Sequence, residues 1–165
     1  MRQAGSDPSF LLKALNEAAG ELRQSFYGLR KRELIEPAAA PDDGWCLLAI
    51  AVHLRNVERG VLGQFEAILS TRGGAIPHVD VDDIPLRDDY QDEDKDTVLE
   101  EFHYLRRHTS YWLWDLSERD WERKGVHPYR GEITIQEIVR ELYRHDLEHL
   151  WQSRRLIEAL GGAGR

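Results

Sequence analysis

The sequence predicts an all-α protein, a four-helix bundle with a long crossover connection between its second and third helices. Three observations indicate this fold. Apolar residues recur at helical spacing in four long segments, glycine and proline clusters separate these segments, and alternation typical of strands is weak throughout. Amphipathic helices of similar length bury their apolar faces against one another, which makes a bundle. The 165 residues fit one domain, expected to span residues 1–165.

The first helix is expected from about Asp7 to Ile35. Asp7 can cap its N-terminus, and Pro8 suits its first turn. Its apolar stripe consists of Phe10, Leu11, Ala14, Leu15, Ala18, Leu22, Phe26 and Leu29. The next stretch, residues 36–44, contains two prolines and ends in a glycine, so it interrupts the helical pattern.

The second helix is expected from about Trp45 to Ser70, with two glycines at positions 73 and 74 to end it. Its apolar stripe consists of Ile50, His53, Leu54, Val57, Val61, Phe65 and Ile68. An acidic connection follows, from Ala75 to about Asp94, and it is long enough to cross from one end of a bundle to the other. Within it, residues 79–84 show a weak alternation typical of a strand.

The third helix is expected to begin near Asp96, where Thr97 and Glu100 have the spacing of a capping box. Its predicted core face consists of Val98, Phe102, Leu105, Trp112 and Leu116. The aromatic residues at its end are expected to pack in the core, with the lining of a pocket as the alternative. These residues are Tyr104, Tyr111, Trp112, Trp114 and Trp121.

The fourth helix is expected to begin where Thr134 and Glu137 form a second capping-box pattern. It runs to Leu160, where two glycines stop it, and it would be about 40 Å long at 1.5 Å per residue. The connection before it contains Gly125, Pro128 and Gly131. In that connection, His127 and Tyr129 are candidates for contacts to a substrate at the mouth of the bundle.

Charge and composition exclude several classes of function. The net charge of −8 argues against a nucleic-acid-binding protein, because affinity for phosphate rests on Lys and Arg. No run of 18 apolar residues predicts a membrane span, and the N-terminal residues lack the apolar core of a signal peptide. The single Cys46 cannot form an internal disulfide. We therefore expect a cytoplasmic protein that acts on a small molecule and binds neither nucleic acid nor membrane.

Three histidines lie on the predicted inward faces of two helices. His145 and His149 are four residues apart, so they share one face of the fourth helix. They continue the apolar stripe formed by Ile138, Leu142, Leu156 and Leu160. His53 lies between Ile50 and Val57 on the stripe of the second helix. Each histidine alone could be an ordinary core residue, but the coincidence of all three favours a metal site in the bundle core.

A site with three imidazoles has a defined chemistry. Neutral imidazole suits Zn²⁺, Ni²⁺, Cu²⁺ and Fe²⁺, and three protein ligands leave a position open for water or substrate. An ion there could lower the pKa of bound water to about 7 or hold a thiol as thiolate. Glu148, about 60° around the helix from His145, could be a general base, and Asp146 could hold a ligand in place. A solvated or ion-paired role is the simpler interpretation of both carboxylates.

Two other metal sites fit parts of the pattern. The spacing of His145, Glu148 and His149 matches the inverted zinc-protease motif, but only 16 residues follow to supply a further ligand and a substrate scaffold. A ferritin-like di-metal site needs two Glu-x-x-His motifs, and Glu100 with His103 provides only one. Both alternatives are therefore disfavoured.

The chain resembles the DinB-like superfamily of metal-binding four-helix bundles, which includes bacillithiol transferases and mycothiol-dependent maleylpyruvate isomerases. The resemblance covers nearly the whole chain and rests on the stretches Trp45–Leu54, Gly131–Ile138 and Arg144–Gln152. In that family, one histidine of the second helix and a His-x-x-x-His pair of the fourth bind the metal. The matching positions here are His53, His145 and His149.

The resemblance implies a left-handed bundle with a crossover after the second helix, one nickel or zinc ion, and a homodimer in many members. It also implies an enzyme that transfers a low-molecular-weight thiol to an electrophile, which is our first hypothesis. A hydrolase that uses metal-bound hydroxide is one alternative, and a metal-binding stress-response bundle without turnover is another. An open coordination position beside a pocket would favour the enzymes, whereas a fourth protein ligand would favour the last.

Overall fold

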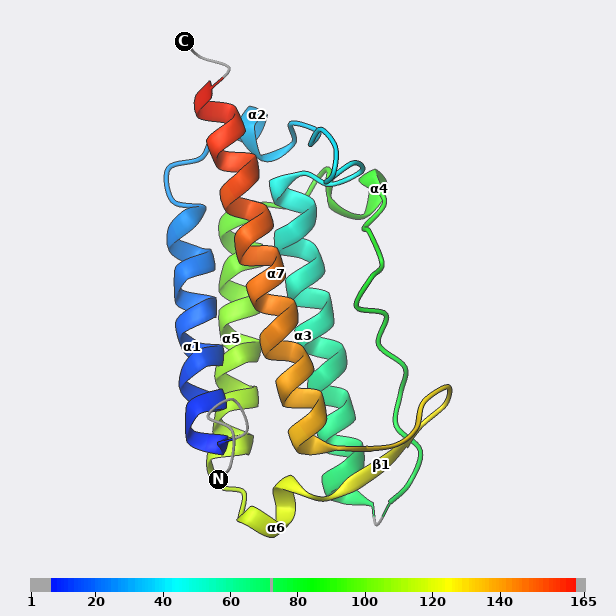
Figure 1. Ribbon diagram of the computed structural model, residues 1–165. Helices are drawn as coiled ribbons and strands as arrows, with labels where there is room; N and C mark the ends of the chain where they lie inside the picture. The colour runs from blue at the N-terminus through cyan, green and yellow to red at the C-terminus, as the bar shows by residue number, and fades with distance from the viewer. Residues whose placement is uncertain (1–6, 72, 163–165) are drawn as a thin grey trace.

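Four long helices lie side by side and form the body of the molecule (Figure 1). The computed structural model describes residues 7–71 and 73–162. The long helices are α1 (Pro8–Ser25), α3 (Leu47–Ser70), α5 (Lys95–Trp114) and α7 (Ile135–Gly162). The connections contain α2 (Lys31–Leu34), α4 (Arg87–Tyr90), α6 (Glu118–Trp121) and the antiparallel strands β1 (Lys124–His127) and β2 (Gly131–Thr134). The predicted all-α four-helix bundle is confirmed.

The crossover connection follows from the directions of the helices. In Figure 1, α3 and α5 both run downward, whereas α1 and α7 run upward. The chain must therefore return along the whole bundle between α3 and α5, and it does so beside α3. A Cβ added to Gly60 of α3 would lie 2.7 Å from Val79 Cγ2, so the missing side chain lets the connection lie close to the helix. The predicted crossover is confirmed.

The structure corrects the prediction at the end of the first helix and at the cap of the third. The first helix does not reach Ile35, because α1 ends at Ser25 and the chain then turns through Gly28, whose φ of +75° lies outside the helical region. The third helix is capped by Asp94, whose Oδ2 accepts a hydrogen bond of 3.0 Å from the Thr97 N–H, and not by the predicted box at Thr97 and Glu100.

The capping box of the fourth helix is confirmed. The Glu137 N–H donates to Thr134 Oγ1 at 3.1 Å, and the Thr134 N–H donates to Glu137 Oε2 at 2.8 Å. The helix continues through Gly162, slightly beyond the predicted end at Leu160. Its 28 residues correspond to a length of about 42 Å.

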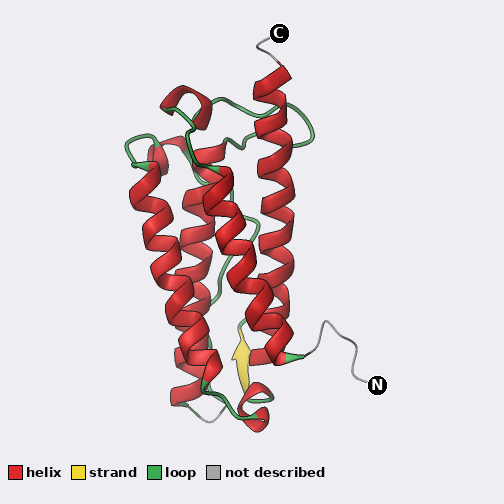
Figure 2. Cartoon of the chain, turned by 90° about the vertical axis from the view of Figure 1, so that its left-hand side faces the viewer, coloured by secondary structure: helices red, strands yellow, loops and turns green. Residues whose placement is uncertain are grey.

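A β-hairpin lies where no strand was predicted. β1 and β2 pair from Lys124 with Thr134 to His127 with Gly131, at the lower end of the bundle (Figure 2). The weak alternation noted at residues 79–84 does not correspond to a strand. Each strand of the hairpin has only four residues, too few for alternation to be recognised in the sequence.

Two apolar clusters fill the interior on either side of a polar layer. The upper cluster includes Leu48, Ile50 and Phe102, and the lower one includes Phe65 and Ile68. Between them lies a layer of buried polar side chains that includes His53, Glu58, Arg106, His145, Asp146 and His149. Within residues 7–71 and 73–162, no helix has the length and apolar character that a membrane crossing requires.

The aromatic residues of the third helix do not form the predicted core. Trp121 is buried, but Tyr111 and Trp114 are more than three-quarters exposed, and Tyr104 also faces outward. The buried face of α5 consists of Val98, Leu99, Phe102, Arg106, Thr109 and Leu113. Because two members of this stripe are polar, the periodicity of apolar residues alone placed the core face at the wrong angle.

Candidate metal centre

Three imidazole nitrogens converge in the polar layer. His53 comes from α3, and His145 and His149 come from adjacent turns of α7. His145 Nε2 lies 2.8 Å from His53 Nε2 and 3.1 Å from His149 Nε2. All three side chains are less than one-tenth exposed, and their potential ligand atoms lie within 4.8 Å of one another. The three predicted histidines are therefore brought together.

The separation of these nitrogens fits a single ion. Two nitrogens that each lie about 2.1 Å from one ion are about 3.0 Å apart at a right angle and about 3.4 Å apart at the tetrahedral angle. The observed 2.8 and 3.1 Å lie near the first value. Among the described residues, the group that could hold a metal has these three members and no fourth His, Cys, Asp or Glu. The arrangement thus leaves coordination positions for other ligands.

Burial keeps the three rings neutral. Burial, the largest cause, and the neighbouring imidazoles, which make a second positive charge unfavourable, together lower the pKa of His53 to about 4 and that of His145 to about 3. Burial also lowers the pKa of His149. At neutral pH the rings therefore have the uncharged form that a metal ligand requires.

Gln152 and Trp45 hold the rings in place. His149 Nδ1 lies 2.7 Å from Gln152 Oε1, and an amide oxygen only accepts hydrogen bonds, so His149 carries its proton on Nδ1. Its Nε2 then has a free lone pair directed at the other two histidines. The Trp45 ring packs edge to face on His53 and His149, with 5.2 Å between ring centroids in both cases.

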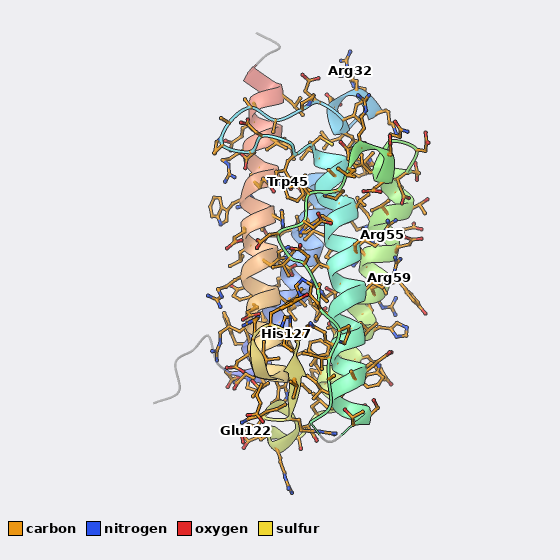
Figure 3. All side chains as sticks on the ribbon, turned by 90° about the vertical axis from the view of Figure 1, so that its right-hand side faces the viewer. Arg32, Trp45, Arg55, Arg59, Glu122 and His127 are labelled. Carbon is orange, nitrogen blue, oxygen red and sulfur yellow. The ribbon has the colours of Figure 1, made fainter. Side chains whose placement is uncertain are left out.

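The crossover connection covers the open side of the site. Figure 3 faces this side, where the connection runs in front of α3 and α7, with Trp45 above and His127 below. The backbone of Val81 lies close enough to His53 and His145 to raise the pKa of both rings, against the larger effect of burial. The connection is therefore part of the wall of the site.

A cavity of about 450 Å³ lies next to the three histidines. Its walls come from α3, the crossover connection, the hairpin and α7, and they include Val61, His78, Val81, His127, His145 and Glu148. This volume suits a small organic molecule. His145 belongs both to the cavity wall and to the histidine group, so a molecule in the cavity would lie beside the three nitrogens.

The two carboxylates considered from the sequence have different positions. Glu148 is exposed and lines the cavity, as a group that acts on a substrate would. Asp146 is buried and points to α5, where its Oδ2 lies 2.7 Å from Arg106 Nη1. Asp146 thus has the ion-paired role that was the simpler interpretation.

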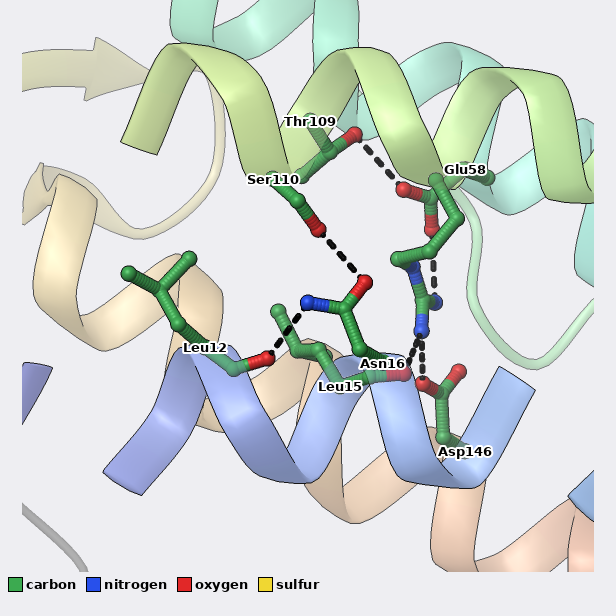
Figure 4. Close-up of polar contacts among 8 residues, drawn as sticks. Leu12, Leu15, Asn16, Glu58, Thr109, Ser110 and Asp146 are labelled. Atoms are coloured by element: carbon green, nitrogen blue, oxygen red, sulfur yellow. Dashed lines mark hydrogen bonds and ion pairs between the residues drawn. The ribbon is translucent and has the colours of Figure 1, made fainter. Parts of the chain in front are cut away.

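A buried ionic network connects all four long helices, and nothing in the sequence pattern indicated it. Arg106 of α5 donates to Asp146 of α7, to Glu58 of α3 and to the carbonyl oxygen of Leu15 of α1, each at 2.7 Å (Figure 4). Thr109 Oγ1 donates to the second oxygen of Glu58 at 2.6 Å. The network lies next to the histidines, since Asp146 directly follows His145 in α7.

Burial acts on both charges of this network. It raises the pKa of Asp146 to about 6, even though Arg106 favours the ionised carboxylate. Burial alone would lower the pKa of Arg106, but Asp146 and Glu58 outweigh it and raise this pKa above its ordinary value. Arg106 Nε and Asp146 Oδ1 are buried without a hydrogen-bond partner in the part of the chain that the structure describes.

The remaining candidates occupy different places. His127 lines the cavity, as its predicted role requires, and its Nδ1 accepts a hydrogen bond from the Tyr129 N–H at 3.2 Å. The Tyr129 side chain is exposed. His78, which the sequence did not single out, contacts His127 across the cavity wall. Cys46 is buried at the N-terminus of α3, as expected of a small apolar residue.

Comparisons with known proteins agree with this architecture. The sequence model of the DinB superfamily matches residues 9–153. Among solved structures, YfiT from Bacillus subtilis is described as a probable metal-dependent hydrolase with an unusual four-helix bundle topology. It is 19% identical, with a TM-score of 0.81, over 93% of this chain and 87% of that chain. No curated protein matched the sequence. Because the superfamily model matches most of its length, the chain belongs to the DinB superfamily.

Proposed function

We propose that the protein is a metal-dependent enzyme that transfers a low-molecular-weight thiol to an electrophile. His53, His145 and His149 would bind one zinc or nickel ion through Nε2. One observation carries this proposal: three buried, neutral imidazoles converge beside a cavity of about 450 Å³ without a fourth protein ligand among the described residues. An open site next to a pocket favours an enzyme over a closed metal-storage or structural site.

The residues around the cavity have separate roles in this reaction. A divalent ion at the three nitrogens would lower the pKa of a thiol in its open coordination position. The thiol sulfur forms a bond to the electrophilic carbon, the leaving group departs with its electron pair, and Glu148 accepts the proton that the thiol releases. Gln152 fixes the His149 tautomer, and Trp45 excludes water from the upper side of the rings.

The first experiment measures metal content. We expect elemental mass spectrometry of the untagged protein to find about one zinc or nickel per chain. The His53→Ala and His149→Ala variants should lose it. His108→Ala is the matched control, because His108 lies on the exposed face of α5 and should keep the metal. Unchanged metal content in His149→Ala would overturn the ligand assignment.

The second experiment tests the reaction. Metal-loaded protein is incubated with 1-chloro-2,4-dinitrobenzene and one of three thiols: glutathione, bacillithiol or mycothiol. We expect thiol-dependent release of chloride that requires the metal. Glu148→Gln should lower the rate and keep the metal, since the side chain lines the cavity but does not belong to the histidine group. Turnover that is equally fast without metal would contradict the proposal.

Hydrolysis is the second candidate function, and the description of YfiT as a probable metal-dependent hydrolase favours it. At 19% identity that similarity shows the fold alone, so the choice depends on the nucleophile. In the hydrolytic reaction, water takes the place of the thiol and Glu148 again accepts the proton. Metal-dependent cleavage of 4-nitrophenyl acetate without any thiol would favour the hydrolase, and an absolute requirement for thiol would favour the transferase.

A further inference from the structure

A pair of histidines forms part of the cavity wall at some distance from the metal centre. His78 lies on the crossover connection and His127 on β1, and His78 Nδ1 is 3.3 Å from His127 Nε2. Their rings meet edge to face with 5.3 Å between centroids, and Tyr129 packs on His78 in the same way at 5.2 Å. Neither ring belongs to the group of three that could hold a metal.

The hydrogen bonds of this pair fix where each ring carries its proton. The Tyr129 backbone N–H can only donate, so His127 Nδ1 accepts and the proton of a neutral His127 is on Nε2. That Nε2–H donates to His78 Nδ1, so a neutral His78 must carry its proton on Nε2. If His127 instead carried its proton on Nδ1, this N–H would point at the N–H of Tyr129, and neither could accept a hydrogen bond.

A charged His127 is disfavoured, because its Nδ1–H would face the N–H of Tyr129. Burial lowers the pKa of His127, and the neighbouring His78 lowers it further, so His127 stays neutral. Among the described residues, His78 Nε2 has no hydrogen-bond partner. It is therefore an oriented donor that is available to a molecule in the cavity.

The distance from this donor to the metal centre suits a small substrate. His78 is three residues before Val81, whose backbone lies against the rings of His53 and His145. Three residues of extended chain span at most about 11 Å. One molecule of modest size can thus contact His78 and still place its reacting carbon near the three histidines.

The charges on the cavity wall indicate which kind of electrophile can bind. The wall carries four carboxylates and two guanidiniums, which are Asp80, Asp82, Glu141, Glu148, Arg130 and Arg144. Arg130 is already bound to Glu141 by two hydrogen bonds, of 2.8 and 2.5 Å. The remaining wall is acidic, which disfavours an anionic electrophile. An N–H donor in such a wall suits the oxygen of a neutral carbonyl group.

We propose that His78 binds the carbonyl oxygen of the substrate through Nε2–H, that His127 is the residue that positions it, and that the electrophile is therefore a carbonyl compound. This inference rests on the proposed function and names its substrate class. When the thiol or water attacks, an electron pair moves onto the carbonyl oxygen, and the His78 N–H stabilises the negative charge that develops there. The proton stays on His78, so no further acid is needed in this step.

The test uses nuclear magnetic resonance on the full chain with ¹⁵N-labelled histidine, zinc-loaded and metal-free. Long-range ¹H–¹⁵N spectra identify the tautomer of each neutral ring, and His78→Phe assigns the His78 signals. We expect the Nε2–H form at His78 in both samples. His127→Leu should produce a mixture of the two tautomers, and His108→Phe, remote from the cavity, should leave His78 unchanged. The Nδ1–H form at His78 in the native protein would overturn the proposal, whether or not His127→Leu folds.

The ligand class is tested with benzamide as a neutral carbonyl probe and benzoate as its charged counterpart. Benzamide should shift the His78 Nε2 signal of the zinc-loaded protein more strongly than benzoate. Its Kd should rise about three- to tenfold in His78→Phe, the effect of one lost hydrogen bond. In His78→Gln, whose amide can donate from a similar position, the Kd should stay within about twofold of native.

Three results would count against the carbonyl assignment. They are a larger shift with benzoate, an unchanged Kd in His78→Phe, and a failure of benzamide to move the His78 signal. This test is separate from that of the proposed function. If His78 has the expected tautomer and contacts benzamide but the protein binds no metal, the donor site stands and the proposed function fails. If the protein binds metal and is active but His78 has the Nδ1–H form, the proposed function stands and the donor site fails.

Discussion

Replacement of Arg106 with methionine should destabilise the fold strongly. The guanidinium is 1% exposed and lies 2.7 Å from a carboxylate oxygen of both Glu58 and Asp146. Methionine fills much of the same space, so the loss comes mainly from two buried carboxylates that no longer have a counter-charge. Removal of one partner from a buried ion pair costs about 3 to 5 kcal/mol. That is a large part of the roughly 5 to 15 kcal/mol that stabilises a typical domain.

Chemical denaturation with urea at pH 7, followed by circular dichroism, measures this loss. Arg154→Met is the matched control, because Arg154 pairs with Glu21 at the surface, where the two side chains are 44% and 51% exposed, and it should lose less than about 1 kcal/mol. Glu58→Gln added to Arg106→Met should recover part of the stability, since it removes one of the unpaired charges. A loss below about 1 kcal/mol in Arg106→Met, with an unchanged m-value, would refute the description of a dry and charged network.

Three further predictions follow from individual contacts. Acidification should destabilise the metal-free protein. Burial lowers the pKa of His53 from 6.5 to about 4, so the unfolded chain binds the proton first, and stability present above pH 6.5 is lost as the pH falls through 4. This single pKa shift corresponds to a loss of about 3 kcal/mol in the free energy of unfolding, and thermal melts between pH 7 and pH 4 measure it. Gly60→Ala should be less stable than Gly63→Ala by about 1 to 3 kcal/mol in urea titrations, because only the former meets Val79, whereas an added Cβ at the latter meets nothing within 4 Å. Thr134→Ala should lose about 1 kcal/mol in the same assay, because it removes the hydroxyl that caps α7, and an unchanged midpoint would contradict that role.

The bundle and its three histidines could be predicted because both depend on local spacing. The stripe of α7 repeats at intervals of three, four and seven residues, and this periodicity places His145 and His149 on the buried face without any knowledge of the other helices. His53 has the same relation to the stripe of α3. The capping box at Thr134 was likewise visible, since its two members lie three residues apart.

The ionic network could not be predicted, because its members pair over long distances in the chain. Arg106 is followed by Arg107 and His108, a polar stretch typical of a solvated helix face, and its partners are 48 and 40 residues away. Only the packing of α3, α5 and α7 shows that this position faces the interior. The same reason explains why Asp146 could not be told apart from Glu148, and why His78 was overlooked.

The parallel arrangement of α3 and α5 explains why the cavity has a wall at all. Antiparallel neighbours need only a short loop, and such a loop would leave the groove between α3 and α7 open to water at the level of the histidines. Because α5 starts at the same end as α3, the chain must pass the whole length of the bundle (Figure 1). On that path it sets Val81 against His53 and His145, and it carries His78 to the hairpin. The crossover thus supplies part of the lining of the site. Substitutions in it should change which molecules bind more than they change the stability of the bundle.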